Sequence, residues 1–99
     1  MFQNFTGTQL VTADAAISAA NIPVRIFSIH ILSGGGGAAV VSLRSGGTVS
    51  GTIRVTETGI VSTGKTFSYG KYGLLFESGC FCDIDANTTS VAVQFEVER

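Results

Sequence analysis

The residues with the most specific spacing for chemistry lie at positions 59–66, where the sequence is GIVSTGKT. It matches the phosphate-binding loop pattern, in which glycines let backbone N–H groups surround a phosphate, lysine contacts the terminal oxygens and threonine binds magnesium. This chemistry requires a buried strand before the loop and a helix after it, because the helix N-terminus faces the anion. Residues 67–73, FSYGKYG, are poor helix formers, and residues 54–58 have the pattern of a half-polar strand. The sequence therefore predicts a turn at 59–66 and no cofactor-binding site.

Two further patterns resemble parts of catalytic sites. Ser62 and Lys65 have the Ser-x-x-Lys spacing of acyl-transfer serine enzymes, but the partner motifs are missing and the local pattern is β. His30, the sole histidine, has no Ser, Cys or Asp at a spacing typical of a catalytic triad. We therefore predict no catalytic residues and no enzyme activity. His30 is expected to be a structural or interface residue, and a pH-sensitive subunit contact is a hypothesis because histidine titrates near neutrality.

Residues 83–87, DIDAN, resemble the first half of an EF-hand calcium loop. The glycine at loop position six and the bidentate glutamate at position twelve are replaced by Thr88 and Gln94. Asp85 and Asn87 are ordinary turn residues. The sequence predicts a turn here and no metal site.

Cys80 and Cys82 are the two cysteines of the chain. In a strand they point to the same face, and a disulfide between such near neighbours would be strained. Metal binding would need further ligands close by. We expect two small buried hydrophobic residues.

Along most of the chain, hydrophobic residues recur with period two, which indicates strands. Residues 24–32 are apolar at both odd and even positions, which predicts a central strand covered on both faces. Residues 48–57 alternate regularly, as in a half-exposed antiparallel strand, and residues 90–98 have the clearest strand pattern. No segment between strands is long enough for a crossover helix. The predicted fold is all-β: a single antiparallel β-sandwich or jelly roll of about eight short strands.

The N-terminal segment is predicted to differ from the rest. Residues 13–21 are rich in alanine and precede Pro23, so we expect a loop or a single helical turn there. The predicted organisation is an arm or loop at 1–22 followed by a β-sandwich domain at 23–99. The apolar residues of the arm need a partner to pack against. Together with His30 they are the candidate interface residues: Phe2, Phe5, Leu10, Ile17 and His30.

The composition indicates an assembly component. Charged residues make up 13% of the chain, against about 25% in average soluble domains, and 13 of 99 residues are glycine. Such a surface lacks the charge that keeps small proteins apart. The net charge of −1 with scattered basic residues argues against nucleic-acid binding. The sequence shows no pattern of a membrane span or signal peptide, so we expect synthesis in a cytoplasm.

The C-terminal third resembles small virion proteins of tailed bacteriophages. The resemblance is carried by residues 72–83, YGLLFESGCFCD, and 87–95, NTTSVAVQF. In that pattern a Gly-hydrophobic-x-Phe strand turns at a glycine into a short apolar strand, and a Thr-rich turn precedes a final Val-x-Val-x-aromatic strand. Here Cys80 takes the hydrophobic position after the glycine, and Phe95 is the terminal aromatic. The resemblance implies a capsid cement (decoration) protein, a β-sandwich that is often trimeric and rivets capsid subunits together.

The leading hypothesis is therefore a phage virion protein that stabilises the head as a homotrimer, with the major capsid protein or another virion protein as partner. The alternative is a small tail, neck or fibre component that binds carbohydrate or a host surface. That alternative predicts exposed rings among Tyr69, Tyr72 and Phe81. An enzyme that uses the phosphate-loop match is the third hypothesis.

Overall fold

The computed structural model describes residues 4–18 and 21–98, with the side chains of residues 4–6 and 98 excepted. Within these ranges all regular structure is β, as predicted. The strands are β1 (Asn4–Val11), β2 (Ala15–Ser18), β3 (Val24–Ser33), β4 (Val40–Ser45), β5 (Ile53–Thr58), β6 (Gly64–Ser68), β7 (Leu74–Phe76), β8 (Cys80–Ile84) and β9 (Thr88–Glu98). None of the described segments is a helix long and apolar enough to cross a membrane.

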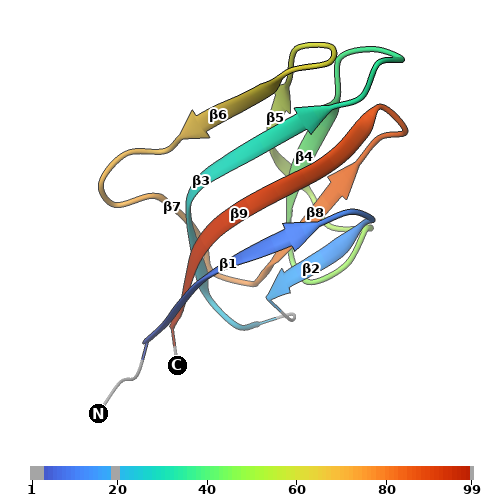
Figure 1. Cartoon of the computed structure of the whole chain (residues 1–99). Helices are drawn as coiled ribbons and strands as arrows, with labels where there is room; N and C mark the ends of the chain where they lie inside the picture. Colours follow the sequence, from blue (N-terminus) through green and yellow to red (C-terminus); the bar gives the residue numbers. More distant parts are fainter. Residues whose placement is uncertain (1–3, 19–20, 99) are drawn as a thin grey trace.

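The strands form two antiparallel sheets packed face to face (Figure 1). One sheet has the order β1-β9-β3-β6, with β7 also paired to β3, and the other has the order β2-β8-β4-β5. The chain changes sheet between all consecutive strands except β4 to β5 and β6 to β7. Neighbours in a sheet are therefore mostly distant in sequence, which is the arrangement of a jelly roll. The predicted fold class is confirmed.

The core lies between the two sheets and consists of the inward-facing residues of each strand. In β3 and β9 these are mainly β-branched, which suits a pleated, half-buried surface. Each large side chain fully buried there contributes about 1.5–3 kcal/mol of hydrophobic free energy. The fully buried large side chains are Val24, Ile26, Ile29, Ile31, Val41, Leu43, Phe76, Val91 and Val93, and the smaller Cys80 and Cys82 are fully buried as well.

Strand β3 lies between β9 and β6, so its central position in the sheet is confirmed. Only one of its faces is covered, however, because His30 is exposed and Leu32 keeps 39% of its surface accessible. The buried positions are even before Phe27 (Val24 and Ile26) and odd after it (Ile29 and Ile31), so the apolar residues at both parities face one core, contrary to the prediction of two covered faces. The pairing of β3 with β9 also shifts register between Ile26 and Ser28, which leaves Phe27 as the extra residue of a β-bulge.

The N-terminal segment differs from the predicted arm. Strand β1 pairs with β9 from Asn4 opposite Glu98 to Val11 opposite Val91, and β2 pairs with β8 in the other sheet. The alanine-rich stretch is a short strand because Ile17 at its centre is buried in the core, with 7% of its surface exposed. Burial of this side chain outweighs the high helix propensity of the alanines. Residues 4–11 and 15–18 thus belong to the sandwich.

Strand β5 is shorter than the strand predicted at 48–57. It begins at Ile53, and the preceding residues form a turn in which the Gly51 N–H donates to the Thr48 carbonyl at 3.2 Å. Val49 lies in that turn and is 55% exposed, so it does not share the buried face of Val55. The alternating pattern continues through the turn because both segments are rich in threonine and serine.

Candidate functional site

The segment that matches a phosphate-binding loop is a tight turn between β5 and β6. The Thr63 N–H donates to the Ile60 carbonyl at 3.0 Å, and Ser62 has a left-handed φ of 56°. A strand follows the turn instead of a helix. The predicted turn is confirmed, and the backbone does not form the helix-backed cradle that a phosphate loop needs.

The two glycines of this segment have packing roles. A Cβ on Gly59 would lie 2.7 Å from the Ser33 hydroxyl oxygen, and one on Gly64 would lie 2.7 Å from Nε2 of His30. Both positions therefore hold glycine because a neighbouring side chain approaches the backbone closely. The two glycines of the phosphate-loop match are thus explained by packing.

The acidic residues that resemble half a calcium loop are engaged elsewhere. The Asp83 carboxylate accepts hydrogen bonds from the Arg44 guanidinium at 3.0 Å. The Asp85 carboxylate accepts from the Asn87 N–H at 3.2 Å and the Thr88 hydroxyl at 2.9 Å, so the predicted turn chemistry is confirmed. Across the described residues, no cluster of three or more His, Cys, Asp or Glu side chains is placed to hold a metal ion.

Cys80 and Cys82 are buried on the inner face of β8, as predicted, and both are free thiols. Burial raises the pKa of each thiol to about 12. The neighbouring Cys82 adds to the shift of Cys80, and Asp14 and Asp83 add to that of Cys82. At neutral pH both groups are protonated and poorly nucleophilic.

The three rings considered for carbohydrate binding do not share one surface. Tyr72 is 74% exposed in the β6–β7 loop, with the Lys71 ammonium 5.7 Å from its ring centre. Tyr69 packs against the core, and its hydroxyl donates to Glu57. Phe81 lies on β8 in the opposite sheet and is partly buried. A platform of several stacked rings is therefore not formed by these residues.

Two of the candidate interface residues come together on the outer face of the five-stranded sheet. Leu10 on β1 and His30 on β3 both lie opposite Ala92 of β9, so the three form one row across the strands. Ile17 lies in the core instead of on a surface. Phe2 lies outside the described residues. In β1 the backbone of Phe5 pairs with that of Val97 in β9, but the side chain of Phe5 lies outside the described part.

The row of Leu10 and His30 belongs to a surface that we call the uncharged face. It comprises outward residues of β1, β9, β3 and β6 that lie beyond the outward pair Arg25 and Glu96, and they alternate with the buried residues of the same strands. They are Thr8, Leu10, Ser28, His30, Leu32, Gly64, Thr66, Ser68, Ser90, Ala92 and Gln94. None of them is an acidic or basic residue apart from the histidine.

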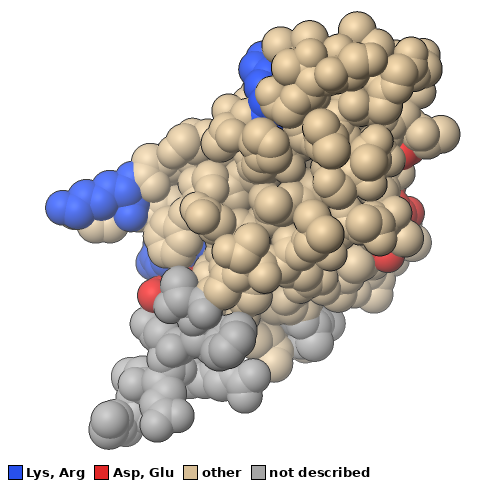
Figure 2. Space-filling model, viewed as in Figure 1, with Lys and Arg blue, Asp and Glu red and all other residues tan. Residues whose placement is uncertain are grey.

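The charged groups lie at the edge of this surface. Figure 2 shows it from the front: other residues cover the centre, while lysine and arginine lie at the left and upper rim and acidic residues mainly at the right. Arg25 and Glu96, which are cross-strand neighbours, mark one end of the uncharged face. The outer face of the other sheet differs, because it carries the Arg44–Asp83 ion pair.

Four polar side chains of the uncharged face bind one another in two pairs. His30 Nδ1 and Thr66 Oγ1 are 2.7 Å apart, and the Ser28 hydroxyl donates to Gln94 Oε1 at 2.8 Å. Each bond joins residues directly opposite on neighbouring strands. A partner that covers these atoms would leave the bonds intact, which lowers the cost of removing them from water.

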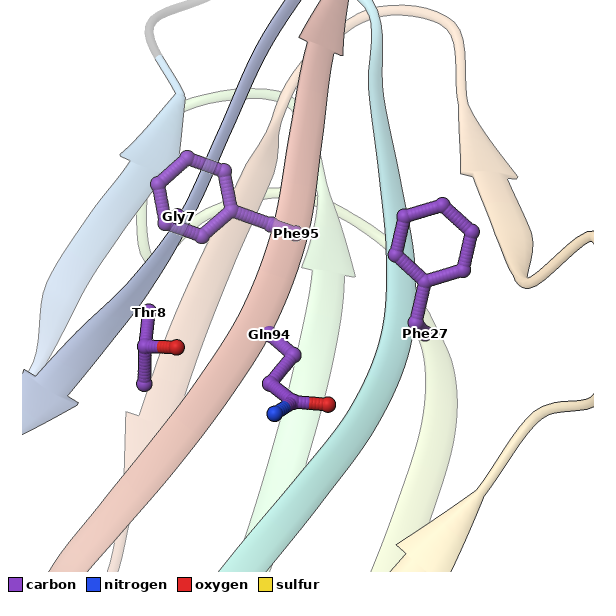
Figure 3. A pocket seen from close by; sticks show the side chains of 5 residues that line it. All are labelled: Gly7, Thr8, Phe27, Gln94 and Phe95. Atoms are coloured by element: carbon purple, nitrogen blue, oxygen red, sulfur yellow. The ribbon is translucent and has the colours of Figure 1, made fainter.

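A shallow hollow of about 370 Å³ opens on the same face (Figure 3). It is lined by Gly7, Thr8, Phe27, Gln94 and Phe95. In the figure the Phe95 ring lies beside Gly7 on β1, and the Phe27 ring lies beyond β3, on the side away from β9. The bulge at Phe27 changes the spacing of the outward residues beside this hollow. Phe95 belongs to the core, with 7% of its surface exposed, so the partly exposed Phe27 ring gives the hollow its apolar side, beside the polar Thr8 and Gln94.

A second hollow, about 400 Å³, is lined by Ser45, Arg54, Leu75, Glu77 and Ser78. Its arginine is engaged within the protein: the Arg54 guanidinium donates to the Leu75 carbonyl at 2.6 Å and lies 4.8 Å from the centre of the Phe76 ring. Because both Arg54 and Glu77 line this hollow, it favours neither an anionic nor a cationic ligand.

Comparison with known proteins identifies a similar fold. No family model matches the chain, and no curated protein matches it. A solved structure from work on Bacillus endospore appendages, described as a novel family of disulfide-linked pili, aligns with a TM-score of 0.51. The alignment covers 98% of this chain and 86% of that chain, at 17% sequence identity. At this identity the likeness concerns the fold.

Proposed function

We propose that this chain is a structural subunit of a protein assembly and works by packing against copies of itself and against other proteins. The observation that carries the proposal is the uncharged face, on which four polar side chains already bind one another in two pairs. Together with a fraction of charged residues of 13%, this surface suits a subunit of an assembly better than a monomer in solution. The similar fold of an appendage protein supports a structural role.

The finer form of the proposal is a phage capsid cement protein in the virion. It rests on the resemblance of residues 72–83 and 87–95, which form β7, β8 and most of β9. Such a subunit would bridge capsid proteins through many small contacts, and its multiplicity on the particle would strengthen the total binding. The resemblance also implies a homotrimer.

A second candidate is a subunit of a filament, since the similar solved structure is described as a pilus protein. The disulfide linkage in that description does not transfer to this chain. Its two cysteines both lie in the core on one strand, where neither sulfur can reach another chain without unfolding of β8. A filament of this chain would therefore be held by non-covalent contacts.

The test is sedimentation of the purified protein over a wide concentration range, together with electron microscopy of the concentrated sample. Self-association with discrete particles supports the cement form, and extended fibres support the filament. A protein that remains monomeric at every concentration and does not co-sediment with phage capsids contradicts a structural role.

A further inference from the structure

We propose that the uncharged face is the surface on which a second copy of this chain docks, face to face. The inference rests on the proposed structural function and adds to it the surface and the partner. The centre of the contact would be the row of Leu10, Ala92 and His30.

The first argument concerns charge. A partner with charged groups over this face would bury them without opposite charges to pair with, which is costly. A second copy presents the same surface, so no Asp, Glu, Lys or Arg side chain of either copy is covered at the centre of the contact, where His30 is the one basic residue. Like charges also do not meet there, whatever the angle between the two sheets.

The second argument concerns hydrogen bonds. The His30–Thr66 and Ser28–Gln94 contacts remain available when the face is covered, because both partners of each bond lie in the same copy. Docking therefore leaves these four side chains paired, whereas the hydroxyls of Thr8, Ser68 and Ser90 would need partners on the second copy. An interface of this kind gains free energy mainly from covering apolar area.

The third argument concerns shape. Leu10 projects from the face with 65% of its surface exposed, and the hollow lined by Thr8 and Phe27 lies on the same face. Thr8 and Leu10 are two positions apart in β1, a separation of about 7 Å. A twofold axis between Thr8 and Leu10 places the Leu10 side chain of each copy in the hollow of the other copy. In such an isologous contact each surface patch meets its own copy.

A face-to-face pair contains an even number of copies. The homotrimer implied by the phage resemblance does not, so the native mass separates the two arrangements. A mass of two chains supports the inference, and a mass of three chains overturns it.

The decisive experiment compares two identical substitutions on opposite faces. Ala92→Glu places a carboxylate at the centre of the uncharged face, whereas Ala16→Glu places one on β2, in the other sheet. Circular dichroism and thermal unfolding establish first that both variants fold. Analytical ultracentrifugation then gives the dissociation constant of each.

We expect Ala92→Glu to raise the dissociation constant about a hundredfold or more, since two carboxylates would meet in the contact. Ala16→Glu is expected to leave it within about threefold of the wild type. Leu10→Ala, which removes the side chain that fills the hollow, is expected to raise it about tenfold.

The remaining outcomes overturn the inference in distinguishable ways. If the wild type associates but Ala92→Glu associates equally well, the surface is wrong and the structural function stands. If the wild type is monomeric yet co-sediments with capsids, and Ala92→Glu abolishes this, the face binds a different protein. If the wild type is monomeric and co-sediments with nothing, the proposed function fails as well.

Discussion

The hydroxyl of Tyr69 donates a hydrogen bond of 3.0 Å to Oε2 of Glu57 and so joins the two sheets at one side of the sandwich. Glu57 lies in β5 of one sheet, and Tyr69 directly follows β6 of the other. Burial raises the pKa of Tyr69 above its ordinary value, and the charge of Glu57 and the hydrogen bond add to the shift. The bond fixes two edge strands whose outer sides have no neighbour in the sheet.

The first prediction concerns the loss of the Tyr69–Glu57 hydrogen bond. Tyr69→Phe keeps the ring but deletes the donor to a charged acceptor, so we expect the free energy of unfolding to fall by about 1.5–3 kcal/mol. Urea denaturation measures the change. Tyr72→Phe is the matched control, because Tyr72 is exposed, and its effect should stay within about 0.5 kcal/mol. Equal effects of the two substitutions would show that the Tyr69–Glu57 bond does not hold the sheets together.

The second prediction concerns the thiols. Because the pKa of Cys80 and of Cys82 rises from 9.0 to about 12 on folding, the native protein should resist thiol-reactive reagents at pH 8. The same reagent should modify both residues in denaturant. Rapid modification of the native protein would mean that β8 opens readily.

The raised thiol pKa also gives a sign for the pH dependence of stability. A group that binds its proton more tightly in the folded state contributes fully below pH 9, and this contribution is lost as the pH rises from 9 to 12. The free energy of unfolding should therefore fall over this interval. In the Cys80→Ala, Cys82→Ala double variant the fall should be shallower, with Tyr69 still contributing in the same direction.

The fourth prediction tests the packing role of Gly59. A Cβ there would press on the Ser33 hydroxyl oxygen, which accepts a hydrogen bond of 3.1 Å from the buried Ala39 N–H. Gly59→Ala should destabilise the fold by about 1–3 kcal/mol. Gly35→Ala is the control, since its Cβ would meet only the Ser62 hydroxyl at 3.7 Å. A neutral Gly59→Ala would leave that glycine without a packing explanation.

The fifth prediction tests whether the N-terminal segment is part of the fold. Ile17→Ala removes a buried side chain and should lower the free energy of unfolding by about 2–5 kcal/mol. Thr12→Ala, in the exposed turn between β1 and β2, should change it by no more than about 0.5 kcal/mol. If both substitutions were neutral, residues 4–18 would behave as the arm or loop outside the sandwich that the sequence predicts.

Much of the fold could be predicted because strand formation leaves a local trace. The alternation in residues 90–98 predicted β9, and the pattern of residues 24–32 predicted the central strand β3. The alanine-rich segment could not be assigned in this way, because Ile17 is its single large apolar residue in the described part. Its strand character depends on contacts with β8, some 60 residues away in sequence.

The candidate surface shows the same division. Leu10 and His30 could be selected from sequence as residues that need a partner, but nothing in their spacing of 20 positions indicates that they share a row. The order β1-β9-β3 brings them together, since both are opposite Ala92. The sequence likewise shows scattered charges, whereas the fold collects the uncharged residues on one face.

The sequence by itself thus determined the class of the protein: an all-β chain with little charge, buried thiols, and motifs whose flanking residues do not suit catalysis. Those properties depend on composition and on neighbours within a few positions. Only the tertiary structure decided which strands lie side by side, that β1 and β2 belong to the sandwich, and where the uncharged face and its hollow lie. The physical reason is that strand pairing is non-local: the sequence period says which side of a strand is apolar, but the partner strand decides which surfaces combine.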